Sequence, residues 1–140
     1  MASTKEFFSE IQVKAIGSAI AAAEDKTSGE IRVHLDKKCD TDPIAAAEKW
    51  FGKLKMHKTE LRNGVLIYLA VDSHVFAIYG DKGINEKVPQ GFWLEISKEM
   101  ETSFRQGEFA EGLINAIHKA GDQLIHFFPR NKDDKNELTN

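Results

Sequence analysis

An uninterrupted apolar run at residues 65–71 is the feature that most restricts what this chain can fold into. A strand with one face in solvent alternates apolar and polar residues, whereas a strand covered on both faces is apolar throughout. The run is also far shorter than the roughly 20 residues that a membrane-spanning helix needs. It therefore predicts a central strand with helices on both sides of the sheet, and no insertion into a membrane.

The segments before and after this run predict its neighbours in the sheet. Residues 30–36 alternate polar and apolar side chains, which indicates a half-buried strand. Residues 72–74 are too few to hold a crossover helix, so residues 75–79 are expected to return antiparallel as a hairpin. The sequence thus predicts three strands, of which the second and third form the hairpin.

Helical patterns account for most of the remaining chain. The first helix is expected to begin at Ser3, which has capping-box spacing to Glu6, and to end near residues 27–29. A second begins with Asp42 before Pro43 and separates the first two strands, which should therefore be parallel with a right-handed connection. The apolar positions expected to face the core are Phe8, Ile11, Ala15, Ile16, Ala19, Ile20, Ala22 and Ala23 in the first helix, and Ile44, Ala47, Phe51 and Leu54 in the second.

Two more helices are expected after the hairpin. One follows Pro89, places Trp93 on its apolar face and has Gly107 as a left-handed cap. The other continues from residue 109 with Phe127 on its apolar stripe, and Pro129 ends it. The predicted order is α-β-α-β-β-α-α, an α/β fold in which a small mixed sheet lies between helical layers as a three-layer α/β/α sandwich.

Size and composition predict a single domain. The 140 residues suffice for one ordinary core, and a hydrophobic content of 41% supports it. We expect residues 1–129 to form this domain, as a monomer, and the polar residues 130–140 to be a disordered tail. A net charge of -3 without a basic run argues against a nucleic-acid binder.

Cysteine use and the start of the sequence bear on where the protein acts. A single cysteine, Cys39, excludes an internal disulfide and fits a reducing compartment. Glu6 and Glu10 interrupt the stretch in which a secretory signal would need an apolar run. These observations predict a soluble, cytoplasmic protein.

Three polar turns, each carrying glycine, are expected to meet at one edge of the sheet. They are residues 28–30 before the first strand, 61–64 before the second and 80–83 after the third. Their oxygen-bearing side chains are of the kind that Ca²⁺ or Mg²⁺ prefers. The candidate ligands for such a cation are Asp81, Glu60, Glu86, Asn63 and Glu30. The alternative is that turns carry these residues only for conformational and solvation reasons.

Other patterns of catalytic chemistry are missing from the sequence. Residues 80–83 lack the spacing of a phosphate-binding loop, and no helix is expected to begin directly after them. Ala45 stands where a phosphatase that used Cys39 as its nucleophile would have an arginine. The five histidines are scattered, and no Gly-x-Ser-x-Gly motif is present. Trp50 and Phe128 are the aromatic residues expected outside the core.

Three stretches of the sequence together resemble the TPM domain family. They are Thr-Ser-Gly-Glu-Ile-Arg-Val at residues 27–33, Arg-Asn-Gly-Val-Leu-Ile-Tyr-Leu-Ala-Val at 62–71 and Ile-Tyr-Gly-Asp-Lys-Gly-Ile at 78–84. The resemblance covers residues 7–128 and includes the order of helices and strands. It implies an α/β/α sandwich, and a soluble bacterial branch of a family that also contains thylakoid-lumen proteins linked to photosystem II repair.

The resemblance also implies functions, since acid phosphatase activity and divalent-cation binding are attributed to some family members. Two positions depart from the family pattern. Ser73 follows Asp72 where the family often has an arginine, and Gln90 stands near Pro89 where an aspartate is usual. For this reason no phosphatase residue is carried over to this chain.

Three functions follow as hypotheses. The first is a domain that binds Ca²⁺ or Mg²⁺ through the turns named above. The second is a metal-assisted acid phosphatase, in which the cation would neutralise the phosphate of a phosphorylated substrate and lower the pKa of an attacking water. The third is a non-enzymatic module for protein interaction or protein maintenance, which would bind a partner protein through an exposed aromatic patch.

Overall fold

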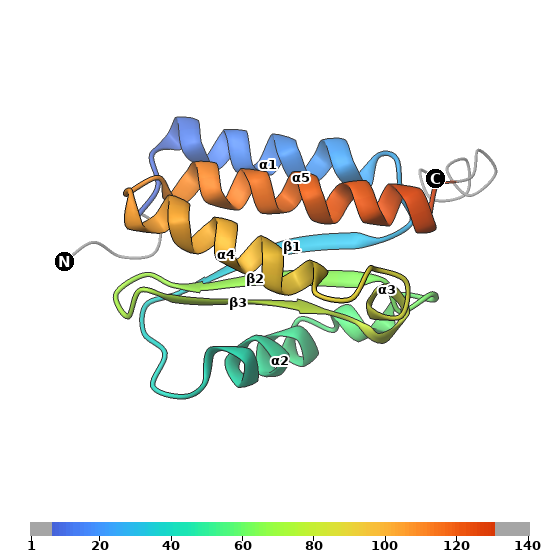
Figure 1. Cartoon of the computed structure of the whole chain (residues 1–140), viewed down its shortest axis with the longest axis horizontal. Coiled ribbons are helices and arrows are strands. Elements are labelled where there is room, and N and C mark those ends of the chain that lie inside the picture. Colours follow the sequence, from blue (N-terminus) through green and yellow to red (C-terminus); the bar gives the residue numbers. More distant parts are fainter. Residues whose placement is uncertain (1–6, 131–140) are drawn as a thin grey trace.

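The computed structural model describes residues 7–130 and confirms a mixed α/β architecture (Figure 1). The strands are β1 (Glu30–Asp36), β2 (Gly64–Ala70) and β3 (Val75–Gly80). The helices are α1 (Glu10–Glu24), α2 (Pro43–Lys53), the short 3-10 helix η2 (Met56–Lys58), α3 (Lys82–Asn85), α4 (Phe92–Arg105) and α5 (Phe109–Phe127). In the described residues, no helix is both long enough and apolar enough to cross a bilayer.

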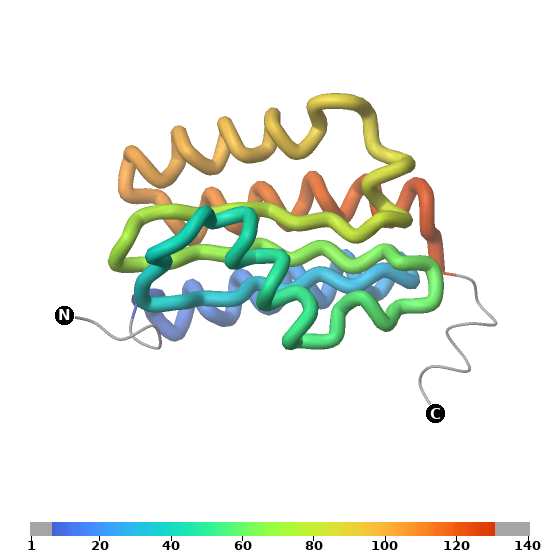
Figure 2. The backbone as a smooth tube through the Cα atoms, turned by 90° about the horizontal axis from the view of Figure 1, so that it is seen from below, coloured from blue at the N-terminus to red at the C-terminus, as the bar shows by residue number. Residues whose placement is uncertain are grey.

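The three strands form one mixed sheet in the order β1-β2-β3. β1 runs parallel to β2, with Glu30 opposite Gly64, and β3 returns antiparallel to β2, with Val65 opposite Gly80. Figure 2 shows the strands side by side, with α2 lying across them. Both the parallel pair and the hairpin were predicted from the lengths of the connections, because a tight turn cannot join parallel strands.

Helices cover both faces of the sheet, which confirms the sandwich. α1, α4 and α5 lie on one face and α2 lies on the other (Figure 1). Every residue of β2 is buried. Val65, Ile67 and Leu69 belong to the core under α1, α4 and α5, whereas Leu66 and Tyr68 belong to the clusters on the side of α2. The apolar run without alternation thus arises because both faces of this strand are covered.

The first helix begins later than predicted. Ser9 is its N-cap: the Ser9 Oγ accepts from the Gln12 N–H at 3.1 Å, and the Gln12 Oε1 accepts from the Ser9 N–H at 3.0 Å. This is a reciprocal capping box. The predicted box of Ser3 and Glu6 lies outside the described residues. The sequence offers two serines with an acidic or amide residue three positions later, and the spacing alone does not choose between them.

The apolar stripes of α1 and α2 are narrower than predicted. In α1 the buried residues are Ile16, Ala19 and Ala23, while Ile11, Ala15 and Ala22 are exposed. In α2 the buried residues are Ala46, Ala47 and Phe51, while Ile44 is exposed. α1 packs mainly on α5, where a Cβ added to Gly121 would lie 2.9 Å from the Ala23 Cβ. Helices this close together leave room between them for only a narrow row of small side chains. The apolar residues at three- and four-residue spacing in α1 therefore outnumber those that the helix interface buries.

Two short helices were missed by the sequence analysis. α3 begins at Lys82, directly after Asp81, where no helix was expected, and η2 follows α2. Asp81 is the N-cap of α3, and its carboxylate accepts from the Lys82 N–H at 2.7 Å. The two helices have four and three residues, which is too short for hydrophobic periodicity to detect.

The C-terminal end of the domain is attached to the start of β1. Thr27 and Pro129 form an isolated antiparallel bridge, and the Arg130 N–H donates to the Lys26 carbonyl at 3.0 Å. Thr27 is fully buried, and its Oγ1 lies 2.6 Å from the Phe128 carbonyl oxygen. Arg130 therefore belongs to the folded domain rather than to the predicted tail, the rest of which lies outside the described residues. The predicted left-handed conformation of Gly107 is confirmed by its φ of 78°.

Aromatic rings fill the layer between the sheet and α2. The ring of His34 stacks on that of Trp50 with 4.0 Å between centroids, and it lies nearly parallel to Tyr68 at 6.1 Å. The Tyr68 hydroxyl donates to the Asp36 Oδ2 at 2.9 Å. Trp50 was expected outside the core, but the structure makes it part of this layer, and Phe128 packs against the core on the opposite face.

Stability is expected to fall as the pH is lowered through the titration of His34. Burial lowers the pKa of His34 below its ordinary value of 6.5, and the nearby Asp36 only partly opposes this. The unfolded chain therefore takes up the proton first, so the contribution of neutral His34 is present above pH 6.5 and is lost as the pH falls below it. Urea denaturation at a series of pH values measures how the free energy of unfolding changes with pH. His34→Gln is expected to make this change smaller.

His118→Gln serves as the control for this experiment, because His118 is exposed on α5. It should leave the pH dependence of the wild type unchanged. A slope that survives in His34→Gln would contradict the assignment of the effect to this ring.

Candidate functional site

The three glycine-bearing turns meet at one end of the sheet, as predicted. The Asp81 N–H donates to the Gly64 carbonyl at 2.9 Å, and the Glu30 N–H donates to the Asn63 carbonyl at 3.4 Å. Backbone hydrogen bonds thus join the end of β3 and the starts of β1 and β2, next to α3 in Figure 1. We call this surface the rim, which consists of residues 28–30, 61–64 and 80–83.

Asp81 is the most firmly held carboxylate of the rim. Its side chain is only 3% exposed. The Arg62 Nε donates to the Asp81 Oδ2 at 2.7 Å, and a terminal nitrogen of the same guanidinium donates to Oδ1 at 2.9 Å. The hydrogen bonds and charge of Asp81 raise the pKa of Arg62 above its usual range. A planar, bidentate pair of this kind fixes the position and orientation of the carboxylate.

Asn63 contributes the second buried oxygen of the rim. The residue is 1% exposed, its backbone N–H donates to the Thr59 Oγ1 at 3.0 Å, and its Nδ2 donates to the Ser28 Oγ at 3.2 Å. Its Oδ1 is buried and accepts no hydrogen bond from any described residue. Buried polar atoms are rarely left without a partner in folded proteins. This oxygen is therefore a candidate ligand atom.

The other three predicted ligands are placed less favourably. Glu30 is half-buried and pairs with Arg32 at 3.0 Å. Glu60 and Glu86 are exposed, and Glu86 caps the C-terminal end of α3. Between residues 7 and 130 there is no group of three or more His, Cys, Asp and Glu side chains that could hold a metal ion. The five candidates thus share one end of the fold without forming a preformed ligand cluster.

The rim offers hard oxygen atoms rather than nitrogen or sulfur ligands. Asp81 supplies a carboxylate and Asn63 an amide oxygen, which is the ligand chemistry that suits Ca²⁺ and Mg²⁺. Such cations take six or more oxygen ligands, so backbone carbonyls, exposed carboxylates or water would have to complete the shell. The residues present fit a divalent cation in ligand type.

The roles of Arg62 and Ser28 in this site were not predicted from the sequence. Both residues stand in the turns that were predicted to converge, but only acidic and amide side chains were considered as ligands. Arg62 has a left-handed backbone conformation, with φ at 54°, which is uncommon for a residue other than glycine. The available signal was an arginine directly before Asn63 and Gly64, in a turn expected to face Asp81.

Exposed apolar side chains do not gather at the aromatic residues that were predicted to be outside the core. Among residues 7–130, the large apolar residues that are exposed are Ile11, Val13, Ile44, Leu61 and Leu94. Ile11 and Val13 are on α1, and the other three are on α2, on the rim and on α4. The exposed aromatic patch that a protein-interaction module would need is thus not formed by Trp50 and Phe128.

Two comparisons with solved structures show the same fold. The BA42 protein of the psychrophilic bacterium Bizionia argentinensis is 48% identical, with a TM-score of 0.85 over 96% of this chain and 92% of that one. The N-terminal domain of a protein from P. gingivalis is 19% identical, with a TM-score of 0.67 over 88% of this chain and 80% of that one. At 19% identity the second likeness concerns the fold alone.

The family comparison covers most of the chain. None of the curated proteins matches the sequence. The family model of the TPM domain, however, matches residues 2–123, which include the whole sheet and the rim. This agrees with the resemblance carried by residues 27–33, 62–71 and 78–84. The chain therefore belongs to the TPM domain family.

Proposed function

We propose that the rim binds a divalent cation, Ca²⁺ or Mg²⁺, through Asp81 and Asn63. The observation that carries this proposal is the buried Oδ1 of Asn63, which accepts no hydrogen bond from the described residues. A buried amide oxygen without a donor costs free energy, and a cation is one of the partners that can satisfy it. Asp81 supplies the negative charge that a divalent ion requires.

The exposed carboxylates complete this proposal. Glu60 and Glu86 flank the rim in sequence and are free to turn toward solvent or toward an ion. Their exposure means that they add charge to the site without the desolvation that a buried carboxylate suffers. We assign them, with Glu30, to the outer part of the site, where they attract the cation and help to fill its coordination shell.

The test is an amide NMR titration of metal-stripped protein with Ca²⁺ and then Mg²⁺, up to about 10 mM to cover weak sites. Saturable shifts confined to Glu30, Asn63, Gly64 and residues 80–86 are expected. Asp81→Asn is expected to abolish them, because it removes the charge while keeping the size of the side chain. Asparagine is also a good helix N-cap, so α3 should persist in this variant.

Asp42→Asn is the matched control for this substitution. Asp42 is the N-cap of α2, and its Oδ2 accepts from the Ala45 N–H at 3.1 Å, so both variants lose the same charge from a helix N-cap, in the control at an exposed position. Asp42→Asn should bind the cation as the wild type does. Diffuse shifts over the acidic surface, or unchanged binding in Asp81→Asn, would contradict the proposal.

The phosphatase hypothesis is tested next with the same variants. Metal-dependent release of phosphate from a generic aryl phosphate, lost in Asp81→Asn and kept in Asp42→Asn, would support an enzyme that acts through the rim. Release that survives in Asp81→Asn would separate any such activity from this site.

A further inference from the structure

Arg62 covers both carboxylate oxygens of Asp81, the atoms that a cation would bind. Its guanidinium donates to both carboxylate oxygens, at 2.7 Å from Nε to Oδ2 and at 2.9 Å from a terminal nitrogen to Oδ1. The Lys82 N–H, at 2.7 Å, already uses a further acceptor position on Oδ1. A bidentate guanidinium covers the edge of a carboxylate that a metal ion would share.

Resting on the proposed cation site, we infer that Arg62 is a built-in competitor of the divalent cation. In the absence of the cation, the guanidinium is the counter-ion of Asp81. When the cation binds, it takes over the carboxylate and the Arg62 side chain moves into solvent. Arg62 thereby sets the affinity of the rim, because the cation must displace it.

The surroundings of Arg62 allow this exchange without unfolding the rim. The Arg62 side chain is 49% exposed, whereas the Asp81 side chain is only 3% exposed. Of the two partners, Arg62 is therefore the one in contact with solvent. Its backbone is held independently of the guanidinium, since its N–H donates to the Thr59 carbonyl at 3.2 Å and its carbonyl accepts from the Gly83 N–H at 2.8 Å. The side chain can thus leave while the turn stays in place.

Charge balance gives the exchange its direction. A buried carboxylate needs a counter-ion, because an unpaired buried charge is strongly destabilising. Arg62 provides one positive charge, whereas a divalent cation provides two and, in the proposed site, would also bind the Asn63 Oδ1, which accepts nothing from the described residues. The Arg62–Asp81 pair therefore stabilises the rim when no cation is bound. The cation displaces Arg62 only if its contacts contribute more free energy than the two lost hydrogen bonds.

The first measurement compares Ca²⁺ affinity in Arg62→Gln, Arg62→Lys and the wild type by calorimetric titration. Removing a competitor that blocks the site about nine-tenths of the time strengthens apparent binding about tenfold. We expect a gain of this size in Arg62→Gln and a smaller gain in Arg62→Lys, which keeps the charge but not the bidentate geometry. Equal or weaker binding in Arg62→Gln would overturn the inference.

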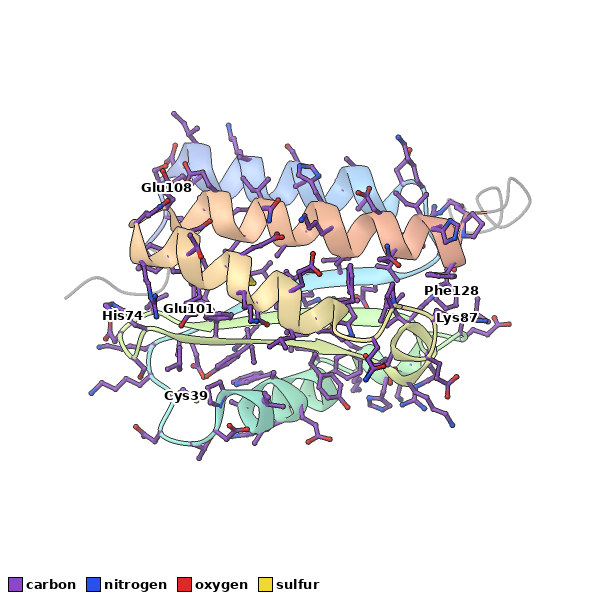
Figure 3. All side chains as sticks on the ribbon, in the orientation of Figure 1. Cys39, His74, Lys87, Glu101, Glu108 and Phe128 are labelled. Carbon is purple, nitrogen blue, oxygen red and sulfur yellow. The ribbon has the colours of Figure 1, made fainter. Side chains whose placement is uncertain are left out.

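Arg105→Gln is the matched control, because Arg105 also pairs with a carboxylate, that of Glu101 at 3.3 Å. Figure 3 shows Glu101 and His74 at one end of the molecule, and Lys87 and Phe128 at the opposite end. Lys87 follows α3 and so marks the end of the molecule where the rim lies. Arg105→Gln therefore removes the same charge as Arg62→Gln, but at the other end of the molecule. It should leave the affinity unchanged.

The second measurement needs no variant. The Arg62 Nε–H donates to Asp81, so its NMR signal should be protected from solvent exchange in metal-stripped protein and lose protection in proportion to Ca²⁺ binding. A signal that stays protected at saturation would show that the pair persists and would overturn the inference while leaving the cation site standing. If neither the wild type nor Arg62→Gln binds Ca²⁺, the cation site and the inference fail together.

Discussion

Gly83→Ala is expected to lower the free energy of unfolding by about 3 kcal/mol, at the upper end of overpacking effects. A Cβ at this position would clash with the carbonyl oxygen of Leu61 and would lie 2.6 Å from that of Arg62. Both obstacles are backbone atoms of the turn before β2, so no side chain can swing away to make room. Chemical denaturation of the variant and the wild type measures the difference.

Gly17→Ala is the control for this substitution. Gly17 lies within α1, and a Cβ there would meet nothing within 4 Å. Alanine is the better helix former, so this variant should be more stable than the wild type by roughly 0.5 to 1 kcal/mol. If Gly83→Ala were as stable as the wild type, the close contact between the turns of the rim would be disproved.

Leu113→Ala is expected to cost about 3 kcal/mol, because it leaves a cavity in the core between α5 and the sheet. The Leu113 side chain is fully buried there. Leu94→Ala removes the same atoms from a side chain that is 60% exposed, and should change stability by no more than about 0.5 kcal/mol. Urea denaturation of both variants tests the pair, and equal losses would mean that α5 is not packed as described.

The sheet could be predicted from the sequence because each of its strands has its own simple signal. Alternation identified β1, the apolar run identified β2, and the three-residue turn fixed the antiparallel return of β3. Convergence of the rim followed from these directions alone, since parallel and antiparallel neighbours bring defined strand ends together.

The parts that were wrong depend on interactions between distant segments. Ile11 and Ile44 have the spacing of core residues but are exposed, because the neighbouring element decides which side of a helix is covered. The start of α1 was placed at Ser3 although the capping box forms at Ser9. Both serines have the spacing of a capping box in the sequence, and only the folded chain distinguishes them.

The candidate site was predictable in position but not in its internal pairing. Asp81 and Asn63 were identified by residue type, and both are buried in the rim. The guanidinium that covers Asp81 comes from a residue 19 positions earlier in the chain. Its reach across the rim depends on a left-handed backbone at Arg62, which no propensity for arginine would indicate.

The bridge between Thr27 and Pro129 has a consequence for synthesis of the protein. α1 and β1 are synthesised before α5, yet α1 packs on α5 and Thr27 is bridged to Pro129. The hairpin of β2 and β3 needs only local contacts, whereas α1 must wait for more than half of the chain. α1 therefore stays unprotected during translation until α5 has emerged, and a truncation that removes α5 leaves the apolar stripe of α1 without its main partner.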